Sequence, residues 1–224
     1  MSFRAVMKVI LPDVLVAVLN RVVNRPSRAR REGNKWLHHH CGKISGRVLS
    51  IGSGSDADNQ GDFYRNYFPR ASSYTTSDVS ECSSCDLTLD IRSMPQIGDE
   101  SYDCIFCSGV LEHVDDCYRG LREITRILKN DGFLILGLPF RQALHMAPQD
   151  FWRFTEFGVK YMLRESYEIV DFIGIDNRVR NFPSAYLVKA RKVSRKAPGE
   201  RSAAPEAGGH KNNTDKQSGE AGSA

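Results

Sequence analysis

The residues best suited to chemistry stand where short apolar runs end. The run 48–51 leads directly into Gly52, Ser53 and Gly54. Glycine permits positive φ angles and lets a ligand approach the main chain closely. A buried strand that ends in such a loop is typical of an open parallel sheet, which binds its ligand at the carboxyl ends of its strands.

Acidic residues end the next two β-prone runs. Asp78 follows the run 73–77, and Asp90 with Ile91 ends the run that begins at Leu87. An acid about 20 residues after a glycine loop is placed to bind two ribose hydroxyls, because a carboxylate accepts hydrogen bonds and donates none. Asp90 and Ile91 together could accept a hydrogen bond from an exocyclic amine and pack against an adenine ring.

Later apolar runs predict the elements that must position these residues. We expect a fourth strand over 102–107 that ends near Ser108, and strands within 133–138, 167–173 and 185–190. A helix from about Asp115 through Leu128, with Tyr118 on its apolar face and Gly132 after its C-terminal end, precedes the fifth strand. The alternation predicts an α/β fold: a Rossmann-like, doubly wound, mostly parallel seven-stranded sheet with helices on both faces.

Five segments in this order resemble the motifs of class I S-adenosylmethionine-dependent methyltransferases, and the subgroup is similar to the type 11 methyltransferases. The segments are 48–54, 78–80, 103–106, 110–114 and 127–134. The resemblance covers about residues 45–192. It departs from the family pattern at Ser50, where an acid is common, at Asp56, where a third glycine is common, and at Asn130-Asp131-Gly132, where Pro-Gly-Gly is usual.

The resemblance implies S-adenosyl-L-methionine as the cofactor and methyl transfer as the reaction. The cofactor-binding residues that it implies are Gly52, Ser53, Gly54, Asp78, Asp90, Ile91 and Ser108. The acceptor would be a small molecule or a glycan, lipid-linked forms included. Two other functions stay open: a catalytically silent methyltransferase-like scaffold and, from the pattern Gly52-x-Gly54-x-x-Ala57, an NAD(P)-dependent oxidoreductase.

His113 is the best candidate for a general base, because an unperturbed imidazole pKa of about 6.5 suits proton transfer near neutral pH. The alternative is a histidine at a helix start that is hydrogen-bonded to the backbone. Glu112 with His113 could also bind a divalent ion, but we predict no metal site. His145, Asp150, Trp152 and Arg153 follow the fifth strand and are predicted to contact the acceptor. Their alternative interpretation is a salt bridge between Asp150 and Arg153, with Trp152 in the core.

Cysteines and a histidine tract have spacings that could bind a metal ion. Cys82-x-x-Cys85 and Cys104-x-x-Cys107 have the spacing of a four-cysteine zinc site. The second pair lies in a predicted strand, where positions three apart point to opposite faces, so we expect free cysteines instead. The tract 38–41, His-His-His-Cys, is interpreted as loop histidines rather than as a chelator.

Charge is distributed unevenly along the chain. The 224 residues carry a formal charge of +4, but residues 1–47 contribute +8 and residues 48–192 contribute −5. We predict a basic amphipathic N-terminal extension (1–44), a methyltransferase domain (45–192) and a disordered tail (193–224), which has no aromatic residue, leucine or isoleucine to bury. The extension would pack on its own domain or in a homodimer, or would contact an anionic membrane surface through residues 1–31.

The composition of the chain argues against two classes of protein. The chain has no run of about 20 apolar residues that could span a membrane. The acidic body lacks the basic face of a nucleic-acid-binding domain, so no nucleic acid is expected as a partner. We expect a cytoplasmic protein, with a peripheral position at the inner membrane face as the alternative.

Overall fold

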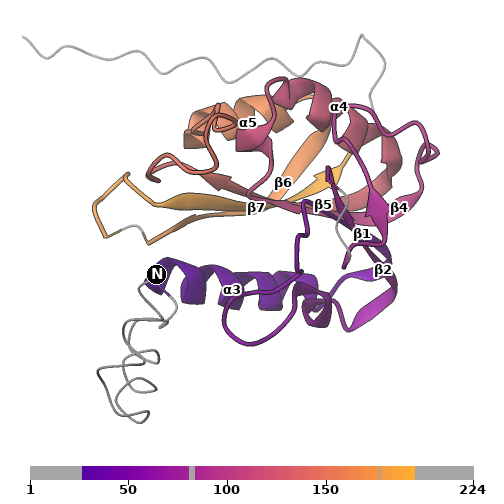
Figure 1. The fold of residues 1–224 in the computed structure, drawn as a ribbon, viewed down its shortest axis with the longest axis horizontal. Coiled ribbons are helices and arrows are strands. Elements are labelled where there is room, and N and C mark those ends of the chain that lie inside the picture. Colours follow the sequence, from indigo (N-terminus) through magenta and orange to yellow (C-terminus); the bar gives the residue numbers. More distant parts are fainter. Residues whose placement is uncertain (1–26, 81–83, 177, 195–224) are drawn as a thin grey trace, which may run out of the picture. The chain divides into compact units, whose positions relative to one another are not determined.

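The computed structural model describes residues 27–80, 84–176 and 178–194, which form one sheet with helices packed on it (Figure 1). The sheet has seven strands in the order β3-β2-β1-β4-β5-β7-β6. Strands β1 to β5 are mutually parallel, and β7 runs antiparallel to its neighbours β5 and β6. The strands are β1 Ser45–Ile51, β2 Arg70–Asp78, β3 Leu87–Thr88, β4 Tyr102–Ser108, β5 Leu128–Pro139, β6 Tyr167–Ile175 and β7 Ala185–Lys192.

Helices cover both faces of this sheet. The helices are α3 Arg28–Cys41, α4 Cys117–Ile127 and α5 Glu156–Leu163, and two 3-10 turns are η1 Tyr64–Tyr67 and η2 Leu111–His113. Helix α3 lies on one face, and α4 and α5 lie on the other (Figure 1). The predicted fold class, a doubly wound and mostly parallel sheet with helices on both faces, is confirmed.

The central strands are buried on both faces, so neighbouring residues pack into different cores. Leu49 belongs to the core under α4 and α5, whereas Val48 belongs to the core under α3. The same alternation separates Cys107 from Cys104. These two thiols therefore cannot share one ion, as the strand prediction implied, while Cys82 lies outside the described residues.

Helix α3 falls within the predicted N-terminal extension, yet it packs closely on the sheet. Its side chains Trp36, Leu37 and Cys41 are buried in the core that α3 covers. Asp171 of β6 accepts a 3.0 Å hydrogen bond from Nε1 of Trp36, and the same carboxylate oxygen lies 2.7 Å from Nε2 of His40. The expectation of loop histidines in the tract 38–41 is wrong, because the amphipathic spacing of the buried residues makes this segment helical.

The chain around the start of β5 differs from the prediction. Helix α4 ends at Ile127, Leu128 is already in β5, and Tyr118 is exposed rather than buried. Gly132, predicted as a helix terminator, lies within β5, where an added Cβ would lie 3.0 Å from the carbonyl oxygen of Asp103 in β4. The glycine therefore permits close strand pairing at an irregularity in the register. Strand β3 is also shorter than the predicted run 87–91.

No α-helix connects β1 to β2, although strands alternating with helices were expected. The segment 52–69 is rich in glycine, aspartate and asparagine, and Asp56, Asn59 and Gly61 have positive φ angles that a helix does not allow. Buried Asp58 organises this loop and accepts a 2.7 Å hydrogen bond from the hydroxyl of Tyr67. Helix α3 supplies the cover that a connecting helix would otherwise provide.

Residues 1–26 and 195–224 lie outside the described part of the chain. The predicted membrane contact or homodimer of the extension and the predicted disordered tail therefore stay predictions. The division of the chain into three segments at 44/45 and 192/193 is a prediction as well. Within the described residues, none of the helices has the length and apolar character needed to cross a membrane.

Candidate active site

Two cavities lie at the carboxyl edge of the sheet and share Gly109, directly after β4. The first, which we call the glycine-loop cavity, has a volume of about 620 Å³ and lies where β1 and β2 end. The second, the α3 cavity, has a volume of about 310 Å³ and lies between α3 and the ends of β4, β5 and β6 and the start of β7. A shared wall residue means that ligands in the two cavities would approach each other at this edge.

The glycine loop is held by close packing behind it. Gly52 has a φ of +68°, and an added Cβ would lie 2.3 Å from Cγ2 of Val110, so only glycine fits. The Ser53 hydroxyl donates a 2.9 Å hydrogen bond to the carbonyl oxygen of Ser50. Gly52 lines the glycine-loop cavity, whereas Ser53 and Gly54 support the loop and are not among its lining residues.

Asp78 lies at the end of β2 and lines the glycine-loop cavity, as predicted for a ribose-binding acid. One carboxylate oxygen accepts a 3.1 Å hydrogen bond from the backbone N–H of Gly54, and the other accepts a 2.8 Å bond from Val79. Each carboxylate oxygen has a second lone pair. The carboxylate is therefore oriented by the loop and can still accept bonds from a ligand.

Asp90 and Ile91 also line the glycine-loop cavity, but Asp90 already has a strong partner. Arg92 donates from Nε and Nη2 to the Asp90 carboxylate, with a shortest distance of 2.8 Å, and Nη1 bonds Asp115 at 2.9 Å. These guanidinium bonds hold the pKa of Asp90 below its usual range. Sequence reasoning missed Arg92 and Asp115, whose spacing from Asp90 carries no signal of its own.

His113 and Glu112 stand side by side in η2 but face different cavities. His113 lines the glycine-loop cavity, and its Nδ1 lies 2.5 Å from the carbonyl oxygen of Gln149. Glu112 lines the α3 cavity and is only 2% exposed, and burial raises the pKa of its carboxyl group. Nε2 of His113 lies 3.9 Å from Oε1 of Glu112. The two side chains thus stand where the cavities meet.

The loop after β5 uses its polar residues mainly on itself. Asp150 and Arg153 form a salt bridge with a shortest distance of 2.6 Å, and Asp150 accepts a 2.8 Å bond from the backbone N–H of His145. The indole of Trp152 donates to the carbonyl oxygen of Val114 and is 42% exposed, so the alternative of a core tryptophan is wrong. None of the four predicted acceptor-contacting residues lines either cavity. Other residues of the loop line the glycine-loop cavity: Met146, Gln149 and Phe151.

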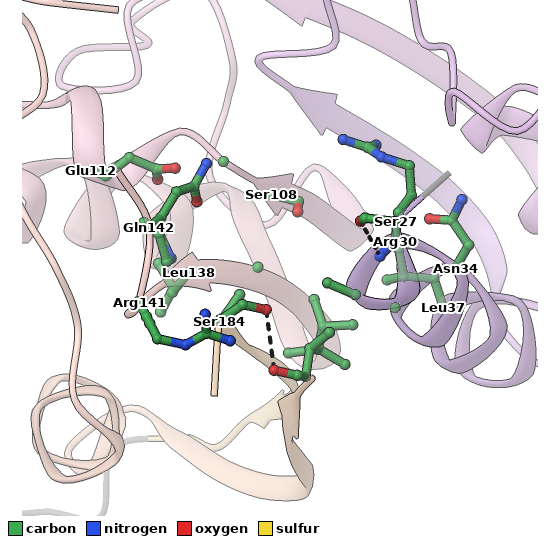
Figure 2. Close-up of a pocket in the computed structure, with 18 of the residues that line it drawn as sticks. Ser27, Arg30, Asn34, Leu37, Ser108, Glu112, Leu138, Arg141, Gln142 and Ser184 are labelled. Carbon is green, nitrogen blue, oxygen red and sulfur yellow. Dashed lines mark hydrogen bonds between the residues drawn. The ribbon is translucent and has the colours of Figure 1, made fainter. Parts of the chain in front are cut away.

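The α3 cavity combines two basic residues, a buried carboxylate and several neutral polar groups (Figure 2). Arg30 and Asn34 reach it from α3, Arg141 and Gln142 reach it from the loop after β5, and Ser108, expected at the cofactor, lies in its wall. Sequence reasoning missed the contribution of α3. The helical spacing of Trp36, Leu37 and Cys41 was the signal that could have revealed it.

A family of known proteins matches part of this sequence. The family model described as "Methyltransferase domain", type 11, matches residues 63–136, about a third of the chain. A search of curated proteins found no match. The predicted resemblance to type 11-like class I methyltransferases is confirmed, and the predicted enzyme class and cofactor agree with the family match.

Solved structures share the fold at low sequence identity. The 1,6-didemethyltoxoflavin-N1-methyltransferase of Burkholderia thailandensis, with S-adenosylhomocysteine bound, is 21% identical over 82% of this chain and 91% of its own, with a TM-score of 0.59. The N-methyltransferase NodS of Bradyrhizobium japonicum, also with S-adenosylhomocysteine, is 17% identical over 73% and 87%, with a TM-score of 0.57.

A third structure limits what the fold implies. The [4+2]-cyclase SpnF is 18% identical over 71% of this chain and 79% of its own, with a TM-score of 0.56. One fold therefore serves different reactions. The fold alone therefore does not define the reaction of this chain.

Proposed function

We propose that this protein transfers a methyl group from S-adenosyl-L-methionine to a small acceptor in the α3 cavity. The observation that carries the proposal is the meeting of two cavities at Gly109, on the carboxyl edge of a sheet with the strand order β3-β2-β1-β4-β5-β7-β6. Methyl transfer needs two ligands in contact, and each cavity suits one of them.

The glycine-loop cavity fits the nucleoside part of the cofactor. Asp78 would accept hydrogen bonds from the ribose hydroxyls, and the buried side chain of Ile91 would pack against the adenine ring. Ser50 bonds the loop internally in place of the acid that is common in the family.

The cofactor, when bound, supplies a methyl group on a positively charged sulfur. This chain would contribute mainly by orienting the acceptor for in-line attack, an effect with a general ceiling of about 7–11 kcal/mol. His113 lines the glycine-loop cavity next to Glu112 of the α3 cavity, and it is the candidate base for an acceptor that loses a proton where the two cavities meet. Its Nδ1 contact with Gln149 fixes the ring and leaves Nε2 as the nitrogen with a lone pair.

The α3 cavity favours a small polar acceptor. Its volume of about 310 Å³ is at the lower end of ligand-binding cavities, so a small molecule or one terminal group of a glycan or lipid-linked glycan would fill it. Arg30 and Arg141 face it and would favour an acceptor with partial or full negative charge.

We also propose a cytoplasmic location for the protein, with residues 1–31 as the candidate membrane contact.

Calorimetric titration with S-adenosylmethionine, S-adenosylhomocysteine and NADP in parallel tests the proposal. We expect saturable 1:1 binding of the first two ligands alone. At about 100 times its dissociation constant, such a ligand should stabilise the fold by about 2.7 kcal/mol. Binding of NADP alone would favour the oxidoreductase. Cofactor binding with no methylation of any acceptor pool would favour the scaffold, and no binding at all would exclude the proposed enzyme.

A further inference from the structure

One carboxylate and two imidazoles meet beside Gly109. Glu112 and His113 come from η2, and His145 comes from the loop after β5. One ligand atom from each of the three side chains lies within 4.8 Å of the other two. The rings of His113 and His145 are in edge-to-face contact, with their centroids 4.7 Å apart. Among the described residues, this is the one group of three or more such side chains with metal-binding proximity.

Each imidazole is held by its Nδ1 atom. Nδ1 of His113 lies 2.5 Å from the carbonyl oxygen of Gln149, and Nδ1 of His145 lies 3.2 Å from the carbonyl oxygen of Ala143. A carbonyl oxygen only accepts hydrogen bonds, so Nδ1 carries the proton in both rings and Nε2 carries the lone pair. In metal sites, a carbonyl oxygen that accepts a hydrogen bond from one ring nitrogen orients the histidine so that the other nitrogen binds the ion.

The carboxylate has an unsatisfied atom. Glu112 is only 2% exposed, and its Oε2 has no hydrogen-bond partner among the described residues. Leaving a buried carboxylate oxygen without a partner is costly, and buried charges normally pair or bind a metal. A cation bound by the Glu112 carboxylate, whose Oε1 lies 3.9 Å from Nε2 of His113, would offset the buried charge, and Oε2 would be available as a second ligand atom.

We propose that Glu112, His113 and His145 form a binding site for a divalent first-row transition-metal ion. Two imidazole nitrogens and one carboxylate suit zinc, iron, cobalt or manganese better than calcium. Two ligand atoms at about 2.1 Å from one ion lie at most about 4.2 Å apart, so the cluster must contract slightly. The ring of His145, 30% exposed in its loop, has room for that movement.

The position of the site suggests its use. Glu112 lines the α3 cavity and His113 lines the glycine-loop cavity, so an ion between them would face an acceptor at the junction. A bound divalent ion lowers the pKa of an oxygen that it coordinates, which would prepare a hydroxyl acceptor for methylation. An ion on Nε2 of His113 would replace the general-base role of that nitrogen. The metal site goes beyond the proposed methyl transfer and is testable without it.

The test uses the full-length protein, stripped with a chelator and free of S-adenosylmethionine. Zn²⁺ is titrated by calorimetry, and Co²⁺ binding is followed by its visible absorption. We expect one ion per chain and a dissociation constant raised more than about tenfold in His145→Ala, because even loss of a residue that only hydrogen-bonds a ligand lowers metal affinity about 10- to 100-fold. Glu112→Gln, which keeps the shape of the buried side chain, should have the same effect.

The matched control is His39→Ala, an exposed histidine of α3 in the tract 38–41. This variant should bind the ion as the unmodified protein does. Three results would overturn the proposal: no ion bound at micromolar to millimolar concentration, unchanged binding in His145→Ala, or loss of binding in His39→Ala, which would move the ion to the tract 38–41. Cofactor titration of the same samples reports on the proposed enzyme separately.

Discussion

At the scale of single residues, the carboxylate of Asp78 is the side chain on which nucleoside binding should depend most directly. We expect Asp78→Ala to weaken S-adenosylmethionine binding roughly 10- to 100-fold, because hydrogen bonds to a charged group contribute about 1.5–3 kcal/mol. Calorimetric titration measures the change. The variant also loses the bond from Gly54, so Asp78→Asn, which keeps an acceptor oxygen, should show a smaller loss. An unchanged dissociation constant in Asp78→Ala would remove this residue from the ribose site.

Glu165→Ala is the control for that prediction. Glu165 is an exposed acid, paired on the surface with its neighbour Arg164 and absent from both cavities. Its removal changes the net charge by the same amount as Asp78→Ala. Cofactor affinity should stay unchanged, which would separate a local loss of hydrogen bonds from a general change in charge.

Single residues also show how far sequence reasoning reaches into the site. Gly52 and Asp78 were predictable, because each stands at the carboxyl end of a β-prone run, where an open parallel sheet binds its ligand. The contact between His113 and His145 was not predictable, because His145 is 32 positions away and reaches the site through a loop without periodic pattern. The ion pair of Asp90 with Arg92 was hidden for a different reason: adjacent charged residues are common on any surface.

At the scale of elements, α3 is both a wall of the α3 cavity and a large part of one core. Leu37 is buried, contacts this core and lines the cavity. Leu37→Ala should lower the free energy of unfolding by about 2–5 kcal/mol, the usual range for a leucine truncated in a core. Urea unfolding measures this loss, and exposed Lys35→Ala on the same helix should change it by less than about 0.5 kcal/mol. Equal midpoints for the two variants would mean that α3 is not part of the cooperative fold.

The contact between α3 and β6 should make stability depend on pH. Burial, together with Lys189, His39 and Lys43, lowers the pKa of His40 below its ordinary 6.5, and Asp171 only partly opposes this. Near and below pH 6.5 the unfolded chain therefore binds a proton that the folded chain resists, so stability falls as the pH falls through this range. Urea midpoints at pH 7.5, 6.5 and 5.5 should decline, and less so in His40→Gln. A parallel decline in both proteins would assign the effect to other groups.

Elements differ in how much of them a sequence can reveal. The central strands were predictable, because buried parallel strands are continuous apolar runs. The end of α4 was not, because 128–132 is polar enough to suggest a helix terminus while its real constraint is pairing with β4. The missing helix between β1 and β2 follows from a local excess of turn-forming residues, whereas its replacement by α3 depends on contacts far apart in sequence.

At the scale of the whole molecule, the question is what the basic N-terminal segment contacts. Removing residues 1–26 keeps Ser27, whose side chain caps α3 by accepting a hydrogen bond from the N–H of Arg30. If this segment binds anionic membranes, its removal should reduce sedimentation with anionic vesicles severalfold while unfolding stays unchanged. A chain that lacks residues 195–224 should sediment like the full chain. Equal sedimentation of the full chain and both truncated chains would contradict membrane binding and would favour a role of residues 1–26 in packing or dimerisation.

The long reach of α3 has a consequence for how the protein is made. Trp36 pairs with a residue 135 positions later, and the carbonyl oxygen of His40 accepts a bond from Lys189, 149 positions later. Domains fold during synthesis from the N-terminus, yet α3 leaves the ribosome long before β6 and β7 exist to receive it. All residues that line the glycine-loop cavity have been synthesised once the chain reaches Phe151, whereas the last residue that lines the α3 cavity is Leu187. A nascent chain would therefore acquire its nucleoside site before its acceptor site, because the contacts of α3 with β6 and β7 form last.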